Sequence, residues 1–176
     1  MSARPSRMAA LALAVLLAAG TARAEITETD ILVAGRAIGF IETLPRGDVH
    51  VGIVYEPGNA QSAQQAHELV ALMGPGLRVG NLVLTPSLLP LDQVGRAGVD
   101  LFFLAQGVGP DAEKVRAASR ARKIPCITFD IAQVRKGTCT MGVRVRPKIT
   151  VFVNRAAADA SGTDLSAVFR MMITEI

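Results

Sequence analysis

The hydrophobic positions of the chain fall into short apolar runs that alternate with stretches of helical periodicity. The run Leu101–Ala105 is apolar on both faces, which is typical of a central parallel strand covered by helices on both sides. Gly107, Gly109 and Pro110 then break the strand, and Asp111 is positioned to cap a helix over Ala112–Arg122. This pattern predicts a strand–turn–helix unit whose turn lies at the carboxyl end of the strand, where open α/β sheets usually carry their sites.

The rest of the chain predicts further units of this kind. Before the central strand we expect a helix over Thr27–Leu44, capped by Thr27 or Thr29, and a strand over Val49–Tyr55. A second helix reaching about Met73, a second strand over Leu77–Thr85 and a short helical or irregular connection over Leu88–Gly98 follow. After it we expect strands over Ile124–Phe129, Met141–Arg146 and Ile149–Val153, then helices over Ala156–Ala160 and from Asp164 onward, the last capped by Thr163. Two strands in succession indicate an antiparallel hairpin. The predicted fold is a single-domain α/β three-layer sandwich. Its mostly parallel sheet ends in an antiparallel hairpin at the C-terminal edge and is flanked by N- and C-terminal helices.

Residues 1–24 have the pattern of a signal peptide rather than of a folded element. Arg4 and Arg7 precede the apolar stretch Met8–Gly20, and Ala22-Arg23-Ala24 has the small-x-small form of a cleavage site. The apolar stretch is shorter than the ~20 residues of a transmembrane helix, so an uncleaved anchor is the less favoured alternative. We therefore predict export to the periplasm, cleavage after Ala24, a single domain over residues 25–176 and no membrane-embedded part after cleavage.

Removal of this segment changes the charge of the chain. The full sequence has 19 Lys and Arg residues against 15 Asp and Glu residues. Because Arg4, Arg7 and Arg23 leave with the signal peptide, the remaining domain is nearly neutral. Its charge therefore gives no support to nucleic-acid binding, and we expect no nucleic-acid partner.

The two cysteines, Cys126 and Cys139, lie in or beside apolar runs predicted to be neighbouring strands. An even number of cysteines in an exported chain favours a disulfide, with two buried free thiols as the alternative. Two distant cysteines and two scattered histidines do not make a metal-ligand set, and a Cys-x-x-Cys redox motif is absent.

Six residues at the predicted strand ends are candidates for a ligand or partner site: Glu56, Gly58, Asn59, Gln106, Gly107 and Asp130. The Gly58-Asn59 turn would present backbone N–H groups at a helix start, but the Gly-Lys-Ser/Thr ending of a phosphate-binding loop is missing. Asp130 has two interpretations, a ligand or catalytic carboxylate and the commoner helix cap.

Catalysis is disfavoured by the motifs that the chain lacks. It contains no Gly-x-Ser-x-Gly, no His-Glu-x-x-His and no paired carboxylates in a polar setting. His50 and His67 lie on different predicted elements and have the setting of surface residues. We therefore expect no enzymatic activity, no metal and no cofactor.

Taken in order, these segments resemble the YfiR/HmsC-type family of small periplasmic proteins. The likeness extends over nearly the whole exported chain, through the segments Phe40–Pro45, Val51–Tyr55, Val99–Ala105, Lys123–Asp130, Val151–Asn154 and Asp164–Met172. The helix start has few aromatic residues, and Val99-Asp100 lacks the cysteine common at that point in the family. The resemblance is therefore to a divergent member.

This resemblance implies a non-enzymatic regulator. Members of the family are associated with repressing a membrane-bound diguanylate cyclase, a cyclic-di-GMP signalling enzyme, by binding its periplasmic part, often in a redox-sensitive way. Carried over, Cys126 and Cys139 would form a structural or sensing disulfide, and Leu165, Phe169 and Met172 on the C-terminal helix would contact the partner or a second copy in a homodimer.

The alternative is a small-molecule binding module. The predicted unit resembles one lobe of a periplasmic solute-binding protein, with the six strand-end residues around the ligand. A complete protein of that kind closes two lobes over its ligand, and this chain is long enough for one.

Overall fold

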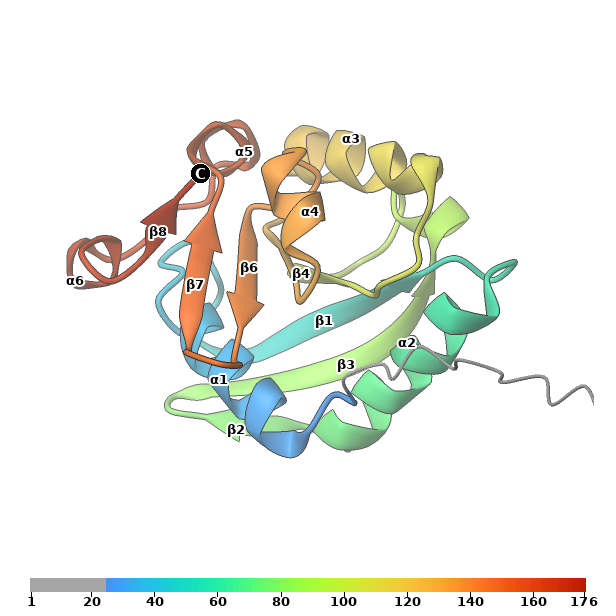
Figure 1. Cartoon of the computed structure of the whole chain (residues 1–176), viewed down its shortest axis with the longest axis horizontal. Helices are drawn as coiled ribbons and strands as arrows, with labels where there is room; N and C mark the ends of the chain where they lie inside the picture. Colours follow the sequence, from blue (N-terminus) through green and yellow to red (C-terminus); the bar gives the residue numbers. More distant parts are fainter. Residues whose placement is uncertain (1–24) are drawn as a thin grey trace, which may run out of the picture.

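The computed structural model describes residues 25–176, so the predicted signal peptide lies outside the described residues. An eight-stranded sheet runs through the middle of the molecule in the order β2-β3-β1-β4-β5-β6-β7-β8 (Figure 1). Its strands are β1 (Gly47–Tyr55), β2 (Leu77–Val79), β3 (Leu82–Pro90), β4 (Leu101–Leu104), β5 (Cys126–Thr128), β6 (Met141–Arg144), β7 (Thr150–Val153) and β8 (Thr174–Glu175). The helices are α1 (Glu28–Ile38), α2 (Ala60–Met73), α3 (Glu113–Arg122), α4 (Ile131–Arg135), α5 (Arg155–Ser161) and α6 (Ala167–Arg170), with short 3₁₀ turns η1 (Leu91–Gln93) and η2 (Pro110–Ala112).

Strands β3, β1, β4, β5 and β6 are parallel, whereas β6 and β7 form an antiparallel hairpin. The predicted α/β fold, its mostly parallel sheet and its C-terminal antiparallel pair are therefore confirmed. The two-residue strand β8 pairs in parallel with the outer side of β7, so the hairpin itself does not form the edge of the sheet.

Two hydrophobic cores lie on opposite faces of the sheet, because neighbouring residues of a strand point to opposite sides. Phe103 of β4 packs in the core beneath α1 and α2, together with Ile38 and Leu69. Its neighbour Phe102 packs in the other core with residues of α3 and α4. This arrangement explains why the central strand is apolar at every position: both of its faces are covered.

The first helix is shorter than the predicted Thr27–Leu44. Thr27 caps it as expected, through a reciprocal capping box in which Asp30 accepts a hydrogen bond from the Thr27 backbone N–H. The helix ends at Ile38, and Ile41 instead forms an isolated bridge with Leu165 near the other end of the chain.

Two predicted boundaries before the central strand are wrong. The expected strand Leu77–Thr85 is a hairpin of β2 and β3, because Gly80 at φ +59° turns the chain. The expected connection Leu88–Gly98 begins as strand, because β3 pairs with β1 as far as Pro90.

Two predicted helix caps are also wrong. Asp111 lies inside η2, and its carboxylate pairs with Lys114 at 2.8 Å instead of capping α3. At the other end of the chain, the helix expected from Asp164 is the four-residue α6, capped by Ser166. Thr163, the predicted cap, shares a hydrogen bond with the Ser161 hydroxyl at 2.7 Å.

Candidate functional site

The order of the strands places a topological switch point between β1 and β4. From β1 the chain passes through α2 to β3 on one side, and from β4 it passes through α3 to β5 on the other. In open α/β sheets, ligands bind in the crevice at the carboxyl ends of such a strand pair. Glu56, Gly58 and Asn59 follow β1, and Gln106 and Gly107 follow β4, so the sequence-based expectation placed five candidates at this point.

The two loops at the switch point bind each other. The Gly109 N–H donates to Glu56 Oε2 at 3.0 Å, which ties the loop after β4 to the loop after β1. The Gln106 N–H donates to Oε1 of Gln65, a buried residue of α2. Polar groups of the predicted site therefore bond the loop after β4 to the loop after β1 and to α2.

Asn59 and Gly107 meet within this arrangement. Asn59 caps α2 by accepting a hydrogen bond from the Ser62 N–H at 3.1 Å. Gly107 has a φ of +76°, and a Cβ atom there would lie 3.2 Å from Asn59 Oδ1. A glycine is therefore required where the two loops approach. Gly58 lies at an exposed turn, where a Cβ atom would meet nothing within 4 Å.

Asp130, the sixth candidate, is a helix cap. Its Oδ1 accepts a hydrogen bond from the Ala132 N–H at 2.9 Å at the start of α4. Within residues 25–176, no hydrogen bond or ion pair joins Asp130 to the loops after β1 and β4. The structure therefore places Asp130 in a capping role, the commoner of its two interpretations.

The predicted disulfide between Cys126 and Cys139 is present, and both residues are buried. It joins the start of β5 to the residue two places before β6, and the loop that it closes contains all of α4. Inside this loop the N–H groups of Thr138 and Cys139 both donate to the Gln133 carbonyl. The segment after α4 is thus held by backbone hydrogen bonds as well as by the disulfide.

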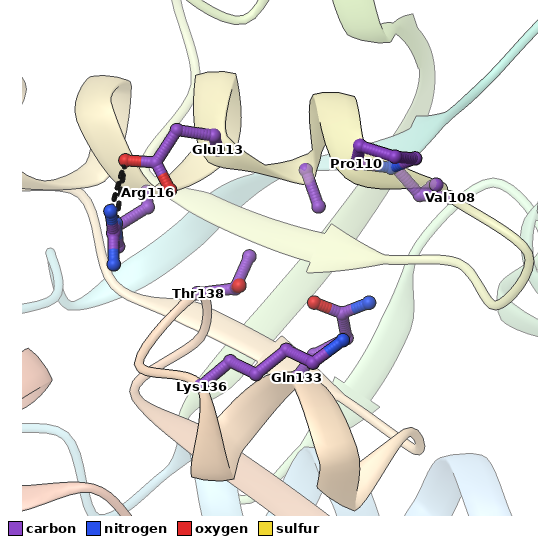
Figure 2. Close-up of a pocket in the computed structure, with 9 residues that line it drawn as sticks. Val108, Pro110, Glu113, Arg116, Gln133, Lys136 and Thr138 are labelled. Atoms are coloured by element: carbon purple, nitrogen blue, oxygen red, sulfur yellow. Dashed lines mark hydrogen bonds and ion pairs between the residues drawn. The ribbon is translucent and has the colours of Figure 1, made fainter.

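A pocket of about 650 Å³ lies between α3 and α4 (Figure 2), and none of the six predicted residues lines it. Its lining consists of Val108, Gly109, Pro110, Ala112, Glu113, Arg116, Gln133, Lys136 and Thr138. On α3, Glu113 and Arg116 form an ion pair in which Nε and Nη2 of the arginine both approach the same carboxylate oxygen, at 2.7 and 2.5 Å. Gln133, Lys136 and Thr138 form the opposite wall.

Reasoning from the sequence missed this pocket. The charges of Glu113 and Arg116 have the spacing of an ordinary solvated helix face, and Gln133 and Thr138 belong to no motif. The one available signal is the position of Gln133, Lys136 and Thr138 between two paired cysteines, where the disulfide fixes the segment that carries them.

The predicted C-terminal interface is only partly exposed. Leu165 and Phe169 are buried, and the Phe169 ring stacks on Phe40 with the ring centroids 4.5 Å apart. These two residues therefore belong to the core and are not available to a partner, a correction that follows from the bridge between Leu165 and Ile41. Met172 is exposed.

In residues 25–176, no helix is long and apolar enough to cross a membrane. Across residues 25–176, no three His, Cys, Asp or Glu side chains gather as they would around a metal ion.

Comparison with known proteins identifies the fold but no family. No family model matches the sequence, and no curated protein matches it. Among solved structures, an ABC domain in complex with L-Trp from Streptococcus pneumonia superposes with a TM-score of 0.55 at 11% identity. A conserved domain protein from Vibrio cholerae O1 biovar eltor superposes with a TM-score of 0.56 at 14% identity. In both comparisons the match covers 84% of this chain and 59% of the other, so the chain spans little more than half of their length.

Proposed function

We propose that this protein is an exported, non-enzymatic regulator that represses an inner-membrane signalling protein of diguanylate cyclase type by binding its periplasmic part. The observation that supports it is a patch of exposed apolar side chains in the C-terminal segment. Val168, Met171 and Met172 are 61%, 80% and 60% exposed and lie within five residues of one another. Exposed apolar side chains that gather in this way are typical of surfaces that bind other proteins.

Contacts with Phe40 fix the segment that carries this patch. Phe169 lies between these residues in sequence and is buried against Phe40, while the Ser166 N–H donates to the Phe40 carbonyl at 3.1 Å. The chain therefore presents Val168, Met171 and Met172 on a fixed segment. Methionine side chains are flexible and polarizable, so they adapt to the surface of a partner.

Other features support the remaining parts of the proposal. The class of partner comes from the resemblance of the sequence to the YfiR/HmsC-type family. A buried disulfide is typical of proteins in an oxidising compartment such as the periplasm. The switch-point loops bind each other, as expected for a protein that does not process a substrate there.

The test is a cross-linking pull-down from native membranes with residues 25–176 as bait, in the oxidised and the reduced state. Wild type is expected to capture an inner-membrane protein with a diguanylate cyclase domain, and reduction of the disulfide is expected to change the yield. A Met171→Asp/Met172→Asp variant should lose the capture. Ile149→Asp is the matched control, because Ile149 is also an exposed apolar residue but lies in the turn between β6 and β7. Absence of a membrane partner in both redox states would contradict the proposal.

A second candidate function is small-molecule binding. It is supported by the 650 Å³ pocket, which lies within the ~300–1,000 Å³ range of ligand sites. The similarity in fold to an ABC domain that was solved with L-Trp agrees with it. Native mass spectrometry of the purified protein tests this function. The expected result is a small molecule that stays bound at a fixed ratio to the chain.

A further inference from the structure

The pocket between α3 and α4 is lined by two largely buried polar residues whose side-chain polar groups bond to no other described residue. Gln133 is 8% exposed and Thr138 is 7% exposed, and both line the pocket. The backbone of Gln133 is engaged at both groups, since its N–H donates to the Asp130 carbonyl and its own carbonyl accepts from the turn after α4. Within residues 25–176, by contrast, the Gln133 amide and the Thr138 hydroxyl make no hydrogen bond. Neither polar group is therefore committed to another part of the fold.

These groups face the interior of the pocket. In the described part of the chain, no side-chain nitrogen or oxygen is both sealed from solvent and without a hydrogen bond. The Gln133 amide and the Thr138 hydroxyl therefore reach solvent, and the pocket is the open space that both residues line. A ligand in the pocket would find donors and acceptors that the fold leaves unsatisfied.

The charges around the pocket favour an anion. Lys136 lies on the same wall as Gln133 and Thr138, is exposed, and forms no ion pair within the described residues (Figure 2). On the opposite wall, Glu113 balances the charge of Arg116, which leaves the Lys136 ammonium as the uncompensated charge of the lining.

We propose that this pocket binds a small carboxylic acid that also carries a hydroxyl or keto group. The Lys136 ammonium would bind the carboxylate, and the Gln133 amide and the Thr138 hydroxyl would bind the second oxygen. Val108, Pro110 and Ala112 supply an apolar surface for the carbon skeleton. The inference rests on the second candidate function, small-molecule binding, and places the ligand between α3 and α4, beside the loop after β4.

Isothermal titration calorimetry on residues 25–176 with the disulfide intact tests the proposal. The probes are malate, 2-oxoglutarate and citrate, with inorganic phosphate as an anion that has no carbon skeleton and glycerol as a neutral polyol. At least one acid is expected to bind with a Kd below about 1 mM. Binding by none of the three acids overturns the proposal. Phosphate binding as tight as that of the acids also overturns it, because the site would then recognise charge alone.

Three variants locate the site. Gln133→Leu, Thr138→Val and Lys136→Met are each expected to weaken binding of the acid by about tenfold or more. Lys148→Met is the control, because Lys148 lies in the turn between β6 and β7 and does not line the pocket. Without ligand, Gln133→Leu and Thr138→Val should melt no lower than wild type, since neither substitution removes a hydrogen bond to another residue. A purely structural role would instead lower their melting temperatures.

The outcomes distinguish failure of the proposed pocket from failure of small-molecule binding as the function. If an acid binds wild type and all three variants equally, the protein binds small molecules but the pocket between α3 and α4 is not the site. If native mass spectrometry finds a bound molecule and no acid binds, the assigned ligand class is wrong and small-molecule binding stands. If neither experiment finds a ligand, both the proposed pocket and the small-molecule binding function are wrong.

Discussion

The guanidinium Nη2 of Arg146 lies 3.0 Å from Oδ2 of Asp30, and this contact joins the N-terminal helix α1 to the segment that follows β6. The Asp30 side chain is buried, while Arg146 is largely exposed. The same carboxylate oxygen accepts hydrogen bonds from the backbone N–H and the hydroxyl of Thr27, both at 2.7 Å. One carboxylate thus closes the capping box of α1 and anchors the helix to the sheet.

This arrangement predicts that part of the stability depends on pH. Burial raises the pKa of Asp30, but the hydrogen bonds from Thr27 and the Arg146 guanidinium outweigh it and hold the pKa below its ordinary value. A lowered pKa means that the contribution to stability is complete above the unfolded pKa of about 3.9 and is lost as the pH falls through the folded pKa. We expect Asp30→Asn to be less stable than wild type by about 1–2 kcal/mol at pH 7.

Urea unfolding of wild type and Asp30→Asn at pH 7 and at pH 3 measures this contribution. The difference between the two proteins should shrink at the lower pH, because pH 3 lies below the unfolded pKa of about 3.9 and the unfolded wild-type chain then binds a proton that the folded carboxylate resists. A stability difference of the same size at pH 7 and at pH 3 would show that the charge of Asp30 is not the stabilising feature. Asp48→Asn serves as a control for the loss of an exposed carboxylate.

Loss of the disulfide is expected to destabilise the protein by about 3 kcal/mol, the chain-entropy estimate for a loop of this size. The two cysteines are 13 residues apart in sequence. Urea unfolding of Cys126→Ala/Cys139→Ala should show this loss, and wild type in reductant should show a similar one. The variant itself should be insensitive to reductant. Equal stability of oxidised and reduced wild type would contradict the prediction.

Gly142→Ala is expected to destabilise the protein by about 1–3 kcal/mol through overpacking. A Cβ atom at Gly142 on β6 would lie 2.6 Å from Val134 Cγ2 and 2.8 Å from Ile131 Cδ1, both on α4. Helix α4 would have to move away from the sheet to make room. Gly58→Ala is the matched control, because a Cβ atom there has open space around it, and its effect should stay within about 0.5 kcal/mol. Thermal unfolding of both variants checks the prediction, and similar melting temperatures would contradict it.

Gln65→Leu is expected to cost about 1–3 kcal/mol and to loosen the loop after β4. The substitution removes the side-chain acceptor of the Gln106 N–H from a buried position on α2. Hydrogen exchange of residues 105–109 should therefore become faster than in wild type. Gln64→Leu, at the exposed neighbouring position, removes a hydrogen bond to Glu68 and should leave that exchange unchanged. Unchanged exchange in both variants would contradict a role for Gln65 in holding the loops together.

Most of the fold could be predicted from the sequence because its strands and helices are marked by patterns of neighbouring residues. Leu101–Leu104 is apolar at every position since the strand is covered on both faces, and Thr27 is followed by Asp30 at the spacing of a capping box. The errors arise where distant segments decide the structure. Leu165, Phe169 and Met172 have helical spacing, but pairing of Leu165 with Ile41 keeps the chain extended and delays the helix until Ala167.

The candidate site was harder to predict for the same reason. The switch-point loops were located correctly from the strand ends, but their polar groups bind each other through contacts such as Glu56 to Gly109. Whether Gln133 and Thr138 are buried, and what they face, depends on the separation of α3 and α4. That separation is set by tertiary packing, including the close approach of α4 to Gly142, and leaves no periodic signal in the sequence.

The pairing of the two ends of the domain has a consequence for the order of folding. The Glu42 N–H donates to the Asp164 carbonyl, and Phe40 stacks on Phe169, so the segment after α1 is completed by residues more than 100 positions later. A chain that is synthesised from its N-terminus cannot complete the core beneath α1 until that last segment has been made. Until then the domain lacks part of this core, which is compatible with the proposed export of the chain before it has folded.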